Sequence, residues 1–105
     1  MAVVRSPNEL LDRIARSRLI GANRLDDYVA SLRRAGGLPD DPGELIAVFR
    51  RDRMLTAYQA KQLLRGEFDA LFFGDKYKVL EFLGAGGMGR VYLCEQILLH
   101  RPVEI

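Results

Sequence analysis

The first two thirds of the sequence contain one unit written twice, and this duplication limits the fold more than any other feature. Residues 6–11 and 41–46 align at an offset of thirty-five positions. Each copy has a side chain that can cap a helix, then proline, then glutamate two positions later. Proline is harmless at a first helical position, and glutamate favours the positive end of the helix dipole. The match continues to Ala22 and Ala57, so we expect two copies of one helical unit.

Apolar residues recur at helical spacing within both copies. They form four stripes: Leu10, Leu11 and Ile14; Leu25, Tyr28, Val29 and Leu32; Leu45, Ile46 and Phe49; and Ala60, Leu63 and Leu64. Thr56 followed by Gln59 is a capping box. We predict two helical hairpins, over residues 7–34 and 42–65, that pack as a small four-helix bundle within residues 1–68. The period is close to that of tetratricopeptide arrays, but their aromatic and glycine signature is missing.

The pattern changes to short runs of β-branched and aromatic residues after a predicted linker at 69–76. Residues 77–83 and 90–95 are typical of two strands of a hairpin, and a third strand is predicted to begin at Val103. The predicted fold class is therefore α+β. Because about thirty residues rarely fold alone, we expect this hairpin either to pack on the helices through Phe72, Phe73 and Phe82 or to be poorly ordered.

Between the two predicted strands lies a glycine-rich segment with the spacing of a phosphate-binding loop. Glycine at 84, 86 and 89 leaves room for backbone N–H groups to approach phosphate oxygens, and apolar side chains flank the loop. The candidate nucleotide-binding residues are Leu83, Gly84, Ala85, Gly86, Gly87, Met88, Gly89, Arg90 and Val91.

Two other interpretations of these glycines stay open. In a dinucleotide fold the loop opens a helix, whereas the residues that follow here, from Val91 to Cys94, are a poor helix start. A purely structural glycine turn is the second alternative.

The stretch from Tyr77 to Tyr92 resembles the opening of bacterial eukaryotic-like serine/threonine protein kinases, in which Gly-Gly-Met-Gly is a frequent form of the nucleotide loop. Residues 55–66 are similar to a region that precedes the kinase domain in some of these proteins. The resemblance implies an incomplete kinase N-lobe over residues 77–105, with Leu83 and Val91 against adenine and the glycine amides near the phosphates of ATP. Val103-Glu104-Ile105 is similar to the residues before the nucleotide-contacting lysine.

The resemblance also implies what is expected beyond Ile105: the lysine, its glutamate partner, the catalytic aspartate and the magnesium-binding aspartate. We therefore expect the chain to be the N-terminal piece of a kinase, inactive alone, with weak or absent ATP affinity. Mg²⁺ would act only in the complete kinase, and no catalytic or metal-binding residue is assigned here. A second hypothesis is a helical protein-interaction module with a passive kinase remnant, and a third is an oxidoreductase fragment.

Charge and composition limit the classes of partner that we expect this chain to bind. Residues 1–66 carry eleven arginines and one lysine against eight carboxylates, a mild surplus that we interpret as a solvated surface rather than a nucleic-acid site. The arginines weighed for phosphate contact include Arg50, Arg51 and Arg53. Cys94 is the single cysteine and fits a small core residue, and we expect a cytoplasmic protein without a membrane segment.

Overall fold

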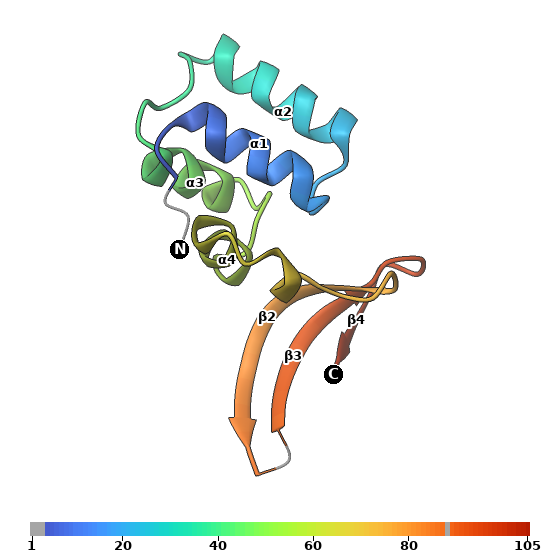
Figure 1. Cartoon of the computed structure of the whole chain (residues 1–105). Coiled ribbons are helices and arrows are strands. Elements are labelled where there is room, and N and C mark those ends of the chain that lie inside the picture. Colours follow the sequence, from blue (N-terminus) through green and yellow to red (C-terminus); the bar gives the residue numbers. More distant parts are fainter. Residues whose placement is uncertain (1–3, 88) are drawn as a thin grey trace.

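The computed structural model describes residues 4–87 and 89–105, which form a helical unit followed by an antiparallel sheet, a mixed α+β fold (Figure 1). The helices in these residues are α1 (Pro7–Ser17), α2 (Ala22–Arg34), α3 (Pro42–Arg51) and α4 (Ala57–Arg65), with a short 3₁₀ turn η1 (Phe68–Ala70). The strands are β1 (Phe72–Phe73), β2 (Tyr77–Gly86), β3 (Gly89–Gln96) and β4 (Arg101–Glu104). Their spatial order is the order of the sequence.

Both helix starts predicted from the repeated sequence pattern are present in the structure. The Ser6 hydroxyl accepts a hydrogen bond of 3.1 Å from the backbone N–H of Glu9. The Asp41 carboxylate accepts one of the same length from Glu44. Thr56 and Gln59 form the expected capping box at the start of α4. In contrast, Gly21 caps α2 without a side-chain hydrogen bond.

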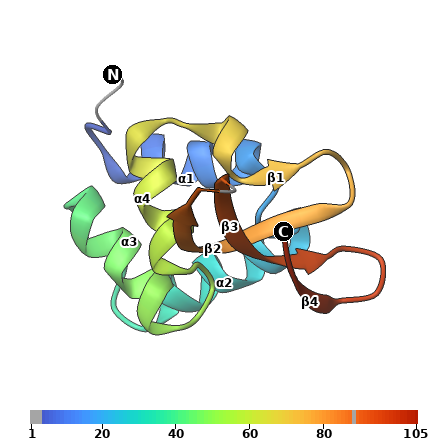
Figure 2. The ribbon, with the colours of Figure 1, turned by 90° about the horizontal axis from the view of Figure 1, so that it is seen from below.

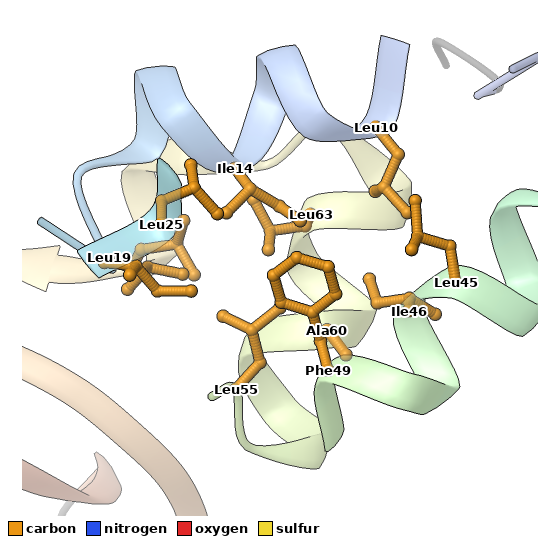
Figure 3. Close-up of a cluster of buried hydrophobic side chains, with 12 residues drawn as sticks. Leu10, Ile14, Leu19, Leu25, Leu45, Ile46, Phe49, Leu55, Ala60 and Leu63 are labelled. Carbon is orange, nitrogen blue, oxygen red and sulfur yellow. The ribbon is translucent and has the colours of Figure 1, made fainter. Parts of the chain in front are cut away.

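Both copies contribute equivalent residues to one core. Leu10 and Ile14 of α1 and their counterparts Leu45 and Phe49 of α3 are fully buried. Figure 3 shows Phe49 in the middle of this cluster, with side chains of α1 and α4 around it. The Tyr28 ring of α2 meets the Phe49 ring edge-on, with centroids 4.8 Å apart. Neither copy closes this core alone, because each supplies only part of the apolar surface.

Helix α1 also binds the end of α4 through a buried arginine. The Arg13 side chain is on the inner side of α1, and its guanidinium donates hydrogen bonds to the carbonyls of Leu63, at 2.9 Å, and Leu64, at 3.2 Å. The last carbonyls of a helix attract cations, so Arg13 adds a second donor to the Leu63 carbonyl, which already accepts from the Gly66 N–H, and also donates to the Leu64 carbonyl. The hydrophobic pattern alone does not predict this contact.

The segment predicted to be a linker, residues 69–76, contains ordered structure. Leu71 is fully buried in the helical core, and its carbonyl accepts a hydrogen bond of 2.8 Å from Val79 of β2. Phe72 and Phe73 then pair with Lys78 and Tyr77 as the short strand β1. The physical reason for the difference is that Leu71 has an apolar partner surface on the helices, which a linker lacks. The strand that was predicted to begin at Val103 is β4, and it begins two residues earlier, at Arg101.

The sheet is held to the helical unit by the capping box of α4. The Gln59 side-chain amide donates to the Val79 carbonyl at 2.8 Å, and the Thr56 hydroxyl donates to the Leu80 carbonyl at 2.6 Å. The Tyr58 hydroxyl donates to the Ala70 carbonyl at 2.7 Å. Figure 2 shows α4 beside β2 and β3 in a second view. Of the three phenylalanines expected to dock the hairpin, Phe72 packs against the core, whereas Phe73 and Phe82 are exposed.

Candidate nucleotide-binding site

Strands β2 and β3 form a long hairpin whose tip carries the candidate loop. Their pairing runs from Tyr77 opposite Gln96 to Gly86 opposite Gly89. Figure 1 shows that the tip projects away from the four helices. The glycine-rich residues therefore lie at the far end of the molecule from the helical core.

An irregularity in the strand pairing brings the two apolar residues of the candidate site together. The register shifts between Phe82 and Gly84, so Leu83 is an extra residue in β2 and Gly84 lies opposite Val91. Two residues of the bulged strand then face one residue of its partner, which places Leu83 beside Val91. Their side chains are 45% and 41% exposed, an accessible apolar surface of the kind that a flat base can cover.

The helices cover one face of this hairpin and leave the Val91 face uncovered by the described residues. Cys94 is fully buried, and the Tyr92 ring on the same face lies 6.0 Å from the Tyr58 ring of α4. Because side chains alternate between the faces of a strand, Val91 and Leu93 are on the opposite face. Burial raises the pKa of the Cys94 thiol, as expected for a small core residue rather than a nucleophile.

The loop glycines differ in whether the backbone conformation requires glycine at their positions. Gly89 has φ of +107°, a conformation that favours glycine, so the turn itself explains it. Gly84, Gly86 and Gly87 have no such backbone angle, and a Cβ on any of them would meet no atom of the described residues within 4 Å. Neither backbone strain nor crowding within these residues explains the three glycines.

The remaining predicted site residues are accessible. Ala85 pairs with Arg90 in the last turns of the ladder, and both are exposed. Met88 lies outside the described residues. The structure thus brings Leu83, Gly84 and Val91 together and puts the other described members at the hairpin tip.

No protein-family model, curated protein or solved structure matches this chain. Within residues 4–87 and 89–105, no three or more side chains of the ligating types gather to hold a metal ion. In the same part of the chain, none of the helices has both the length and the apolar character needed to cross a bilayer.

A second group of residues comes together only in the structure. Arg50, Arg51 and Arg53 are exposed, as the solvated-surface interpretation expects, and they line one hollow with Arg24 and Lys78. The signal available in the sequence was the density of arginine in residues 50–53, where Asp52 is the single carboxylate. The contributions of α2 and β2 to this hollow come from distant parts of the chain, so the sequence pattern did not reveal them.

Proposed function

We propose that residues 83–91 bind the phosphates of ATP in the manner of the glycine-rich loop of a serine/threonine protein kinase. The observation that carries the proposal is the pair Gly84 and Gly86 in strand β2, where neither a left-handed backbone angle nor crowding by the described residues requires glycine. Glycine in an extended strand costs conformational entropy and contributes no packing, so its use at Gly84 and Gly86 of β2 needs another reason. Close approach of a ligand to the backbone supplies one.

The surroundings of the loop support the same function. Leu83 and Val91 offer an apolar surface for the adenine ring, on the face that the described helices do not cover. Ala85, Gly86 and Arg90 of the tip are exposed, so phosphate oxygens can approach the backbone N–H groups there that the ladder does not use. Mg²⁺ would reach this site bound to the phosphates of ATP.

The proposal is tested by titrating the chain with ATP and magnesium into the millimolar range and following backbone amide shifts by NMR. We expect saturable shifts confined to the loop, with Gly84, Gly86 and Val91 among the affected residues. The test variant is Gly86→Val, because valine suits a strand and a Cβ at this position meets none of the described atoms within 4 Å. Gly21→Ala, at a glycine that also has open space, is the matched control.

Loop shifts that disappear in Gly86→Val, persist in Gly21→Ala and accompany an unchanged melting temperature would support ATP binding. Absence of saturable shifts would overturn the proposal. Shifts centred on Arg50 and Ala57 instead of the loop would also overturn it, since ATP would then be binding to the arginine-lined hollow.

A further inference from the structure

A basic hollow of about 750 Å³ lies where the turn between α3 and α4 meets α2 and β2. Its cationic lining residues are Arg24, Arg50, Arg51, Arg53 and Lys78, and its lining includes no carboxylate. Interiors and clefts lined by one sign of charge concentrate ligands of the opposite sign. The hollow is therefore suited to an anionic partner.

Three of these cations have no carboxylate partner within 4.0 Å in residues 4–87 and 89–105: Arg24, Arg50 and Arg53. The other two are already engaged. Arg51 pairs with Asp52 at 3.0 Å, and Lys78 donates to the Leu19 carbonyl and lies 3.8 Å from Glu95. The three arginine side chains thus remain available, and a guanidinium can bind a carboxylate through two parallel hydrogen bonds.

Helix-end electrostatics does not account for all of these charges. Arg50 and Arg51 end α3, where cations complement the helix dipole. Arg24, however, is the third residue of α2, where a positive charge opposes the dipole. Its position is unfavourable for an isolated helix, so the helix dipole does not explain why this hollow has a cation there.

A second hollow of about 400 Å³ extends the first along α3 and α4. The two share Arg50 and Ala57, and the second adds the cations Lys61 and Arg65, again without a carboxylate. Its apolar lining includes Leu64, which is 36% exposed although the sequence pattern assigned it to the core. We call the two hollows together the basic groove. Its extent suits a segment of chain better than a single small anion.

The floor of the basic groove is aliphatic. Leu19, Met54 and Leu80 line the larger hollow, and no aromatic side chain lines either one. Single-stranded nucleic acids gain much of their affinity by stacking bases on aromatic side chains, so this lining does not favour them. A peptide whose aliphatic side chains alternate with carboxylates would match both the aliphatic floor and the cationic rim of the basic groove.

We propose that the basic groove binds an acidic peptide segment of a partner protein. Carboxylates of the segment pair with Arg24, Arg50 and Arg53, and its aliphatic side chains pack on Leu19, Met54 and Leu80. Arginine clusters that recognise acidic motifs work by this combination of charge pairing and shape. This inference is independent of nucleotide binding at the hairpin tip, because none of residues 83–91 is among those that line the basic groove.

The test is fluorescence anisotropy with the full chain and a short fluorescein-labelled peptide of alternating glutamate and leucine. Its charge-reversed counterpart, alternating lysine and leucine, is the peptide control. We expect Arg50→Glu and Arg53→Glu each to weaken binding about tenfold or more, because each replaces attraction by repulsion. Arg34→Glu is the matched protein control: Arg34 is likewise exposed and near a helix end, but it lines neither hollow. Affinity should fall as NaCl is raised.

Loss of binding in the groove variants with retention in Arg34→Glu would support the proposal. Three outcomes would overturn it: no binding of the acidic peptide, equal binding of the lysine peptide, or an equal loss in Arg34→Glu. Tighter binding of an oligothymidylate that is lost in Arg50→Glu would reassign the groove to nucleic acid. Circular dichroism checks that each variant folds, and Arg50→Gln replaces Arg50→Glu if the reversed charge prevents folding. In Arg50→Gln the expected loss of affinity for the acidic peptide is smaller than in Arg50→Glu, but it still exceeds the loss in Arg34→Glu.

Discussion

Arg18 and Arg53, which are equivalent in the two copies of the repeat, share a left-handed backbone conformation. Their φ angles are 63° and 59°. Each lies just after the first helix of its copy, where the chain turns towards the next helix. Left-handed φ is costly for a residue with a Cβ. The two predicted copies therefore share the same strained turn.

Replacing either arginine by glycine should stabilise the protein by about 0.5–1 kcal/mol, since relief of the left-handed strain exceeds the entropy that glycine adds to the unfolded chain. Urea denaturation of Arg18→Gly and Arg53→Gly measures the change. The equivalence of the two turns predicts similar values. A stabilisation in one copy and a loss in the other would contradict it.

The joint between α4 and the sheet should be sensitive to Gln59. In Gln59→Ala the Val79 carbonyl loses its donor and the Thr56 N–H loses its acceptor, both at partly or fully buried sites. We expect a loss of about 1–3 kcal/mol in the free energy of unfolding. Lys61→Ala, on an exposed position of the same helix, is the control and should change stability by less than about 0.5 kcal/mol. Equal losses in both variants would show that the hydrogen bonds of Gln59 are not responsible.

Cys94 reports on the same joint through its reactivity. The Cys94 thiol is fully buried, and burial raises its pKa. Both the access of a reagent to the sulfur and the fraction of the thiol that is ionised are therefore reduced. We expect labelling by a thiol-specific disulfide reagent at pH 8 to be slow in the native chain and fast in urea. Gln59→Ala should accelerate native labelling. Fast labelling of the unmodified chain would indicate that the sheet is not held against α4.

The contact between α2 and the end of α3 should depend on pH. Asp52 accepts hydrogen bonds from Arg51 and, at 2.6 Å, from the Tyr28 hydroxyl, and these lower its carboxyl pKa. A lowered pKa adds stability above the unfolded value of about 4, and this stability is lost as pH falls through the lower folded value.

Asp52→Asn should therefore reduce the dependence of melting temperature on pH below about 4. Tyr28→Phe removes one of the two residues that donate hydrogen bonds to Asp52, so it should reduce the pH dependence of the melting temperature in the same direction but by less. Thermal unfolding monitored by circular dichroism across this range makes the comparison. Identical acid profiles for Asp52→Asn and the unmodified chain would contradict the assignment.

Local signals predicted the local structure well. The caps at Ser6, Asp41 and Thr56 and the proline starts were predictable because each depends on residues a few positions apart. The α+β composition followed from the change of periodicity near residue 69. Leu64 was misplaced because helical periodicity identifies an apolar stripe without showing how far the neighbouring helix extends over it.

Long-range features were not predictable in the same way. The sequence indicated that Thr56 and Gln59 form a capping box, but not that their remaining donors bind strand β2. That role depends on where the fold places two carbonyls, 24 positions after Thr56 and 20 positions after Gln59. Local sequence patterns do not encode these positions. The candidate loop was found by its glycine spacing, whereas the basic groove combines residues of α2, α3 and β2 and needed the structure.

Recognition of strand β2 by helix α4 relies on main-chain carbonyls, those of Val79 and Leu80, and a carbonyl is common to all amino acids. Substitutions along the outward side of the strand therefore leave the attachment intact, provided the backbone keeps its path. The sheet can thus diverge in evolution faster than the capping box that holds it. Thr56 and Gln59 are the positions where we expect divergence to be slowest.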